Sequence, residues 1–405
     1  MKKSICLFTL GEDLNKIFIV HSKIILQLKK EFGNFTIISF SNFLQNEEVK
    51  KIDIELLKKL NISDIKFFFP KTKKDFNKYI EDKKIYGIDC MGINYTKSWK
   101  FRRMVNKKNI SLVLILDGGY ISNEVIVPNI GIKNILYESK RYLLRKIYRL
   151  LVLINFFPPI FIYFDCRKNI VDHFLKNKKF HYVEKFFPFL NIFNIKNIYH
   201  INNKSFDYSN LNDDIVSENK IIFIDGNYKN EEFLFRENLD FKEIEQYYFK
   251  YISKVLKKLE EIYEQKVEIC LHPSSDERSY KDFFNKIGIH VSKGDTRKKI
   301  FQASIVLFHE SSAIIDAIYL KKKIISLKTD LFGGYHSKRV ELYKNELNLL
   351  SINIKDYIDL SKDKINKKYN ESIPLYEKYL NKLHTKYDNE KGSEKITRIL
   401  KTFID

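Results

Sequence analysis

Short apolar runs recur along the first half of the chain, separated by polar stretches whose apolar residues fall at helical spacing. The runs are rich in Ile, Leu, Val and Phe without regular polar alternation, and they cover residues 4–10, 34–40, 84–90 and 110–119. Strands that are apolar on both sides are typical of parallel sheets buried on both faces. Their alternation with helices, as over residues 13–32, predicts right-handed βαβ units.

A second series of the same kind begins near residue 215. Its expected strands are residues 220–226, 266–273, 289–294, 304–310 and 323–330, and its expected helices are residues 241–265, 279–288, 295–303 and 311–321. The whole pattern predicts an α/β protein with two Rossmann-like, doubly wound domains, over residues 1–205 and 215–363. The charged segment 364–405 is expected to be helical and to pack back across the linker.

Neither domain opens with the GxGxxG sequence that marks dinucleotide-binding folds. Its absence disfavours a dinucleotide-dependent oxidoreductase. Two Rossmann-like domains in series predict a cleft between them, and this arrangement resembles the GT-B type of glycosyltransferase. Nucleotide-sugar epimerases share the arrangement and stay an alternative.

The composition adds a strong positive charge. The 405 residues include 72 Lys and Arg against 51 Asp and Glu, which gives a formal net charge of +21. Such a charge favours anionic partners such as nucleotide sugars, acidic lipid surfaces or nucleic acid, although a bias toward AT-rich codons would also enrich lysine. The basic residues are scattered, and no zinc-finger, homeodomain or RNP-like pattern occurs, which disfavours nucleic acid.

The cysteines and the apolar runs favour a cytoplasmic protein. Cys6, Cys90, Cys166 and Cys270 form no CxxC pair, so we expect buried thiols rather than a zinc or redox site. The N-terminal apolar run is too short for a signal peptide. The longest uncharged run, residues 150–164, is shorter than the about 20 residues of a spanning helix and contains a Pro-Pro pair. Together with the basic segment before it, this run predicts either an inter-domain core helix or a contact with the membrane interface.

Three sequence features stand at strand ends in the second domain. "LHPSS" (residues 271–275) leaves its strand at His272 and Pro273, because proline cannot donate a hydrogen bond to a sheet. "SKGDT" (292–296) is a glycine turn before a helix, and "FHESSAIIDA" (308–317) starts a helix with Ser311 and Ser312. The carboxyl ends of parallel strands meet at the ligand-binding edge of such folds, so the three features predict one site.

The chemistry of these features suits a phosphate group. A helix start offers unpaired N–H groups and roughly half a positive charge, and a serine there adds a hydroxyl donor. His272 can donate a hydrogen bond to a phosphoryl oxygen, and Gly294 allows the backbone to approach a ribose or a base. Asp225, which ends its strand before Gly226, is expected to face the same cleft. We therefore predict a nucleotide site.

The quoted segments resemble the C-terminal half of bacterial surface-polysaccharide glycosyltransferases. That group carries an HP motif and a Ser-rich motif, and it includes bacterial sialyltransferases and related CMP-sugar transferases. The resemblance is best over about residues 200–330. It implies a CMP-activated acidic sugar, such as a sialic-acid-like nonulosonate, as the donor, and a glycan or lipid-linked saccharide of capsule or lipopolysaccharide as the acceptor.

The resemblance also assigns roles to residues of this chain. It gives the phosphate to His272, Ser311 and Ser312. It gives the base and ribose to Lys293, Gly294 and Thr296, with a ribose hydroxyl for Glu310. The predicted nucleotide-binding set further includes Asp225, Gly226, Pro273 and Ser274.

The resemblance places the catalytic base in the first domain, where related sialyltransferases carry an acidic-acidic-glycine motif. This sequence has "LILDGGY", in which Leu116 replaces the first acid before Asp117. Asp117 is our candidate base, with His272 as its catalytic partner, and Asp89 and Glu12 are the substitutes. A base that deprotonates the acceptor hydroxyl during direct displacement would invert the anomeric carbon.

No DxD motif stands at a strand end, so we expect neither a metal nor another cofactor. Helix starts, His272 and the nearby Lys293 or Arg278 would meet the charge of the leaving group instead. Residues 332–343, "FGGYHSKRVELY", are expected to form a loop, either structural or mobile over the donor.

Two other functions stay open beside the glycosyltransferase: a UDP-GlcNAc 2-epimerase-like enzyme and a non-catalytic glycan-assembly protein. We expect the protein in the cytoplasm, either free or in peripheral contact with the anionic inner face of the cytoplasmic membrane.

Overall fold

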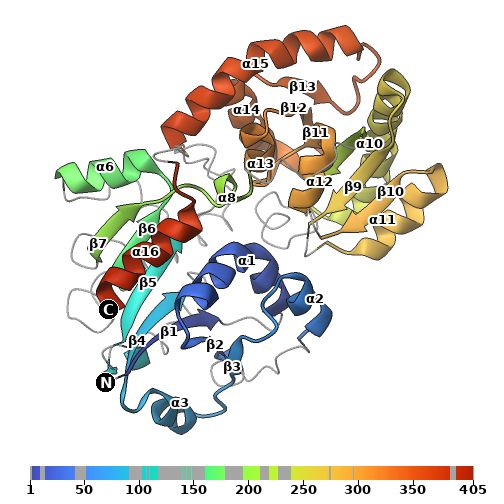
Figure 1. The fold of residues 1–405 in the computed structure, drawn as a ribbon. Helices are drawn as coiled ribbons and strands as arrows, with labels where there is room; N and C mark the ends of the chain where they lie inside the picture. The colour runs from blue at the N-terminus through green and yellow to red at the C-terminus, as the bar shows by residue number, and fades with distance from the viewer. Residues whose placement is uncertain are drawn as a thin grey trace. The chain divides into compact units, whose positions relative to one another are not determined.

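In the computed structural model, the chain forms two compact units (Figure 1). The first comprises Met1–Asp117, Lys140–Asp207 and Thr385–Asp405, and the second comprises Gly118–Ser139 and Tyr208–His384. The structure describes residues 2–9, 14–41, 52–90, 110–116, 160–177, 195–209, 219–226, 239–272, 275–294, 296–383 and 389–404, with a few further positions between 103 and 147.

The first unit is built on a parallel sheet of seven strands in the order β3-β2-β1-β4-β5-β6-β7. The strands are β1 (Lys2–Thr9), β2 (Phe35–Ser39), β3 (Lys66–Phe68), β4 (Lys83–Asp89), β5 (Ser111–Leu116), β6 (Ile160–Asp165) and β7 (Ile195–His200). Apolar side chains of β1, β2, β4 and β5 enter a core on each face of the sheet. Burial on both faces explains why these sequences show no regular polar alternation.

Helices cover both faces of this sheet. They are α1 (Leu14–Glu31), α2 (Ile54–Lys59), α3 (Lys73–Ile80), α6 (Lys168–Asn177), α8 (Phe206–Ser209) and α16 (Gly392–Ile404). Side chains of α1, α2 and α16 belong to one core, and those of α3 belong to the other. The carboxylate of Asp207 accepts hydrogen bonds from the N–H groups of Gly392 and Ser393, at 2.6 and 3.0 Å. These contacts satisfy two unpaired donors at the start of α16.

The second unit contains a parallel sheet of six strands in the order β10-β9-β8-β11-β12-β13. The strands are β8 (Lys220–Ile224), β9 (Val267–Leu271), β10 (His290–Lys293), β11 (Ala303–Phe308), β12 (Lys323–Lys328) and β13 (Leu350–Asn353). β10 and β13 are the edge strands of this sheet.

Helices flank this second sheet on both sides as well. They are α10 (Phe241–Tyr263), α11 (Glu277–Phe284), η2 (Asn285–Ile287), α12 (Thr296–Gln302), α13 (Ile314–Tyr319), η3 (Asp330–Phe332), α14 (Gly333–Leu347) and α15 (Lys362–Leu383). Side chains of α10 and α11 fill the core on one face, and those of α12, α13, α14 and α15 fill the core on the other. The chain after residue 361 is thus shared between the two units, with α15 in the second and α16 in the first.

Both sheets have the strand order of a Rossmann fold. Numbered from its own first strand, each contains the order 3-2-1-4-5-6, and the first sheet adds β7 at one edge. The prediction of two Rossmann-like, doubly wound α/β domains is confirmed.

Two sequence-based expectations about local structure need correction. The loop predicted over residues 332–343 is wrong, because Gly333–Leu347 forms α14 with Val340, Tyr343 and Leu347 buried. Residues 160–164 belong to the buried strand β6, so no helix extends to the end of the uncharged run 150–164. The rest of that run lies outside the described residues.

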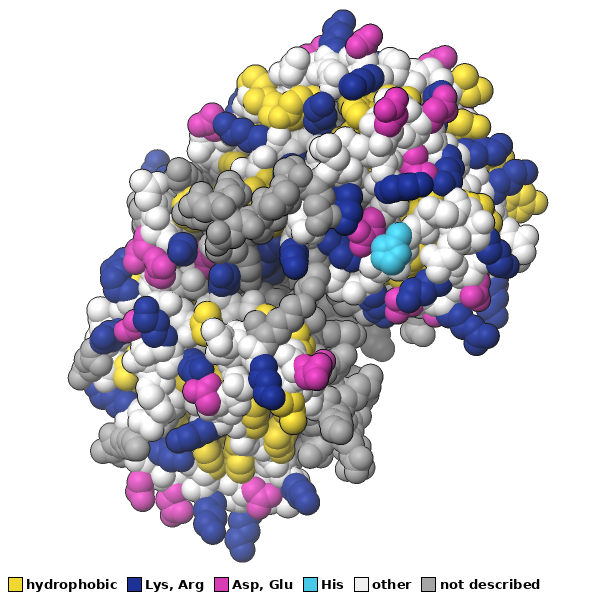
Figure 2. Space-filling model, turned by 45° about the vertical axis from the view of Figure 1, so that its right-hand side comes forward, with side chains coloured by type: hydrophobic (Ala, Val, Ile, Leu, Met, Phe, Trp, Pro, Cys, Tyr) yellow, Lys and Arg dark blue, Asp and Glu magenta, His cyan; other side chains and the backbone are white. Residues whose placement is uncertain are grey.

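The surface agrees with the scattered charge of the sequence. On the face in Figure 2, Lys and Arg side chains are spread among Asp and Glu rather than gathered in one patch. Among the described helices, none combines the length and the apolar character needed to cross a membrane.

Candidate functional site

The second sheet has a topological switch point between β8 and β11. From these two neighbouring strands the chain continues to opposite sides of the sheet, through β9 and β10 on one side and through β12 and β13 on the other. In open α/β sheets the loops diverge at such a point and leave a crevice outside the carboxyl ends of the strands, where ligands bind. The strands at this point end at Ile224 and Phe308, directly before Asp225 and the "HESS" segment.

Strand register brings the predicted junctions to one level of this edge. Lys293 pairs with Leu271, and Ile224 pairs with both Cys270 and Phe308. The chain leaves the four neighbouring strands β10, β9, β8 and β11 within one or two residues of these pairs, toward Gly294, His272, Gly226 and Glu310. The junctions after β9, β10 and β11 therefore leave the same edge of the sheet, as the sequence predicted.

The turn after β9 is fixed by buried hydrogen bonds. The Ser275 N–H donates to the carbonyl of His272 at 2.9 Å, and the Ser275 hydroxyl donates to Asp225 Oδ2 at 2.6 Å. The Tyr280 hydroxyl donates to Asp225 Oδ1 at 2.9 Å, and Lys293 Nζ donates to the Ser275 carbonyl at 2.8 Å. Asp225 is 1% exposed, whereas His272 is exposed at the end of its strand. The carboxylate and the ammonium thus hold the turn that presents His272.

The junction after β10 is a glycine turn. Gly294 has a φ of +83°, a left-handed conformation that favours glycine, and a Cβ placed there would meet open space. Thr296 is half-buried and begins α12. The backbone at Gly294 is accessible to a ligand.

The junction after β11 is a turn of serines. The Ser311 hydroxyl accepts a hydrogen bond from the Ala313 N–H at 3.3 Å, and the Ser311 carbonyl accepts one from the Ile314 N–H at 3.3 Å. Ser311 is half-buried and Ser312 is exposed. α13 begins at Ile314, so the two serines precede the helix by two to three residues rather than start it.

Sequence reasoning missed Arg339, which lies beside this junction. Its Nη2 is 2.6 Å from Glu310 Oε1. Burial raises the pKa of Glu310, and the Arg339 guanidinium opposes that rise. The helical spacing of the apolar residues in α14 could have placed Arg339 on a helix rather than in a loop.

His309, also in the Ser-rich segment, is a core residue. Its ring is fully buried, with Nδ1 2.7 Å from the carbonyl of Leu327 and Nε2 3.1 Å from the hydroxyl of Tyr248. Burial lowers the pKa of His309 to about 3. Because a carbonyl only accepts, Nδ1 carries the proton and Nε2 accepts from Tyr248. The neutral ring thus ties the end of β11 to β12 and α10.

Asp117, Glu12, Pro273 and Ser274 lie outside the described residues. The substitute base Asp89 is described: it is buried and ends β4, at the β1–β4 switch point of the first sheet.

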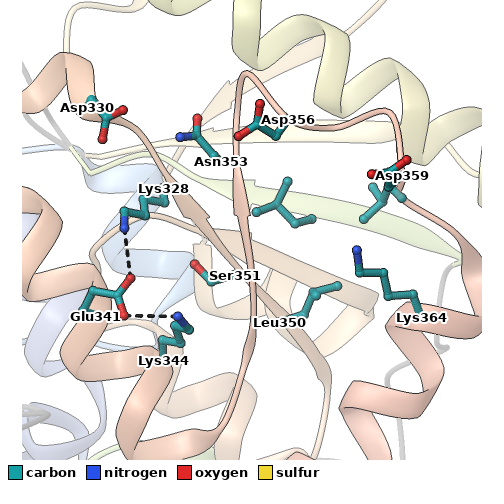
Figure 3. A pocket seen from close by; sticks show the side chains of 12 residues that line it. Lys328, Asp330, Glu341, Lys344, Leu350, Ser351, Asn353, Asp356, Asp359 and Lys364 are labelled. Atoms are coloured by element: carbon teal, nitrogen blue, oxygen red, sulfur yellow. Dashed lines mark hydrogen bonds and ion pairs between the residues drawn. The ribbon is translucent and has the colours of Figure 1, made fainter.

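A cavity of about 510 Å³ lies elsewhere in the second unit, against the edge strand β13 (Figure 3). There Glu341 lies between Lys328 and Lys344, with N–O distances of 3.1 and 3.3 Å. None of the predicted site residues lines this cavity, and the acids Asp330, Glu341, Asp356 and Asp359 offset its lysines. The charge of this cavity is therefore mixed.

Metal ligands do not cluster in the described part of the chain. There, no group of three or more His, Cys, Asp or Glu side chains is arranged to hold a metal ion.

Comparisons with known proteins agree on the fold. No protein-family model matches the sequence, and no curated protein sequence matches it. Among solved structures, a variant of the wall teichoic acid polymerase TagF soaked with CDPG has a TM-score of 0.55 at 12% identity, covering 99% of this chain and 89% of that one. A putative UDP-N-acetylglucosamine 2-epimerase from Listeria monocytogenes has a TM-score of 0.52 at 12% identity, covering 100% and 97%.

A third structure, MnaA of S. aureus with UDP, has a TM-score of 0.51 at 12% identity, covering 100% of this chain and 97% of that one. The similarity runs through both units in every case. The chain therefore has a GT-B-like fold, with two parallel-sheet α/β units.

Proposed function

We propose that this protein is a nucleotide-sugar-dependent glycosyltransferase that inverts the anomeric carbon. The observation that carries the proposal is the common edge of β8, β9, β10 and β11, from which three turns present His272, Gly294 and Ser311. Imidazole and hydroxyl donors together with an accessible backbone suit the phosphate and ribose of a nucleotide. Two of the similar structures, TagF with CDPG and MnaA with UDP, carry such compounds in their names.

The finer assignment rests on the family resemblance of the sequence motifs. We propose a CMP-linked acidic sugar as the donor, a glycan or lipid-linked saccharide as the acceptor, and surface polysaccharide as the product. His272 and the serines would bind the phosphate, and Lys293 would support the turn that carries His272. The general base is proposed to be Asp117, with Asp89 as its substitute, and no metal is proposed to take part.

A nucleotide-sugar epimerase is the second candidate. One of the similar structures is named as a putative UDP-N-acetylglucosamine 2-epimerase, and another is named as a complex with UDP. The epimerase would act on UDP-GlcNAc without an acceptor. The two candidates therefore differ both in the nucleotide and in the need for a second substrate.

A panel of CMP-, CDP-, UDP- and GDP-linked donors tests this proposal by thermal shift. We expect the CMP-linked donor to stabilise the protein most, and the stabilisation to be lost in His272→Ala. Stabilisation by UDP-GlcNAc alone would favour the epimerase. Stabilisation by none of the donors would favour a non-catalytic glycan-assembly protein.

The proposed base is tested separately from the binding site. Asp117→Asn should keep donor binding and lose transfer, because an amide cannot accept the proton of the acceptor hydroxyl. Full activity of this variant would remove Asp117 from the mechanism and turn attention to Asp89.

A further inference from the structure

Arg339 brings a fixed positive charge to the switch point of the second sheet. Its guanidinium contacts Glu310, two residues beyond the end of β11, at 2.6 Å. The side chain of Glu310 is 18% exposed and that of Arg339 is 38% exposed. The pair is therefore partly exposed at the carboxyl edge of the sheet, and the guanidinium is the more exposed of the two groups. A guanidinium keeps its proton at any physiological pH.

The helix that carries Arg339 is anchored against β11 on both sides of this residue. One turn before it, the buried ring of His336 lies 5.5 Å from the ring of His309. One turn after it, the buried ring of Tyr343 lies 5.1 Å from the ring of Phe308 in an edge-on contact. These neighbours fix α14 against the end of β11, and the contact with Glu310 holds the guanidinium at that end.

Of the two cations predicted for this site, Arg278 is an exposed residue of α11 that pairs with Asp282, and Lys293 holds the turn after β9. Its ammonium group donates to the Ser275 carbonyl at 2.8 Å, within the turn that presents His272.

Arg339 contacts the side chain of Tyr343 as well as Glu310. Its planar fork of five N–H donors can serve several acceptors at once, a phosphate among them.

We propose that Arg339 binds a phosphoryl oxygen of the nucleotide and that Glu310 positions its guanidinium. This inference rests on the proposed function, since it assigns a residue to the same nucleotide site. It also replaces the ribose contact expected for Glu310 from the sequence. The carboxylate acts on the arginine instead.

The test compares nucleosides with nucleotides, so that the contribution of the phosphate is measured by itself. Cytidine, CMP, uridine and UDP are titrated by calorimetry into the wild-type protein and into Arg339→Gln, which keeps much of the side-chain length without the charge. The ratio of nucleoside Kd to nucleotide Kd should fall by about 10-fold or more in Arg339→Gln, while nucleoside binding stays within about threefold. Arg339→Lys, a point charge without the planar fork, should recover only part of the ratio.

Two controls separate a binding role from a structural one. Lys344→Gln removes the same charge from the same helix, where Lys344 pairs with Glu341, and should leave the ratio unchanged. Glu310→Gln keeps the guanidinium but removes the carboxylate that positions it, so the ratio should fall, though by less than in Arg339→Gln. A structural ion pair would instead lower the melting temperature equally in Glu310→Gln and Arg339→Gln, without changing the ratio.

The outcomes also distinguish this inference from the proposed function. If the wild-type protein binds CMP or UDP and Arg339→Gln keeps the full ratio, the role of Arg339 is overturned while the nucleotide site stands. If the wild-type protein binds no nucleotide, the proposed function fails, and the role of Arg339 fails with it.

Discussion

The position of Asp225 could be predicted from the sequence, but its hydrogen-bond partners could not. Its position at a strand end follows from the apolar run before it and the glycine after it. Its partners, Ser275 and Tyr280, lie 50 and 55 residues further along the chain, so its hold on the His272 turn could not be predicted from the sequence. The sequence also left Arg339 without a role, because its segment was expected to be a loop.

Replacing Asp225 by Asn should weaken this turn. The amide nitrogen cannot accept a hydroxyl hydrogen bond, so one of the two bonds from Ser275 and Tyr280 is lost. We expect the free energy of unfolding to fall by about 2 to 3 kcal/mol in urea denaturation, together with weaker nucleotide binding. Tyr280→Phe, which removes one bond alone, should cost about 1 to 1.5 kcal/mol.

The matched control for Asp225→Asn is Glu277→Gln. Glu277 forms an exposed ion pair with Lys281, and such pairs contribute little, so its loss should cost less than about 0.5 kcal/mol. An Asp225→Asn protein as stable as this control would show that the buried hydrogen bonds do not hold the turn.

His309 should make the second unit sensitive to acid. Burial lowers its pKa in the folded state to about 3, whereas an unfolded histidine titrates near about 6.5. Between these values the unfolded state binds the extra proton, so stability is fully present above about pH 6.5 and falls as the pH drops. The loss approaches about 1.4 kcal/mol per pH unit for this one group.

Urea denaturation at pH 7, 6 and 5 tests the titration of His309. His309→Gln removes the titrating ring, so its stability should depend less steeply on pH, by about 1 kcal/mol per unit between pH 6 and 5. Tyr248→Phe removes the hydrogen bond to the ring but keeps the ring, and should retain the wild-type slope. Equal slopes for His309→Gln and the wild type would contradict the buried, neutral histidine.

At the scale of elements, the apolar runs were the dependable signal. Strands formed where runs rich in Ile, Leu and Val predicted them, as in β2, β4, β9 and β11. A strand buried on both faces of a parallel sheet needs apolar side chains on both sides, which is the pattern of these runs. α14 was missed because Gly333 and Gly334 are poor helix formers, while tertiary packing of Val340 and Leu347 outweighs that preference. Low helix propensity therefore does not prevent a helix from forming where its apolar side chains can pack into a core.

α16 should be essential to the first unit, because its apolar side of Ile396, Ile399 and Leu400 completes one of the two cores of that unit. Leu400→Ala leaves a cavity beneath the helix and should lower the free energy of unfolding by about 2 to 5 kcal/mol. The neighbouring Lys401→Ala, at an exposed position, should change stability by less than about 0.5 kcal/mol in the same denaturation experiment. A Leu400→Ala protein as stable as Lys401→Ala would mean that α16 is dispensable.

At the scale of the molecule, alternation of strands and helices predicted two Rossmann-like units, and the similar structures share that GT-B-like fold. The strand order itself could not be predicted, because it depends on which strands pair across long connections. The predicted junctions lie at one edge of the second sheet because its strands are parallel, so that their carboxyl ends meet at that edge. The base in the first unit stays a prediction, since Asp117 lies outside the described residues.

A crystal structure of the protein with CMP would test the central claim most directly. The account predicts the phosphate at the carboxyl edge of β8, β9 and β11, within hydrogen-bonding distance of His272 and of Ser311 or Ser312. A phosphate bound against β13, in the cavity beside Lys328 and Lys344, or a nucleotide that leaves His272 untouched, would contradict it.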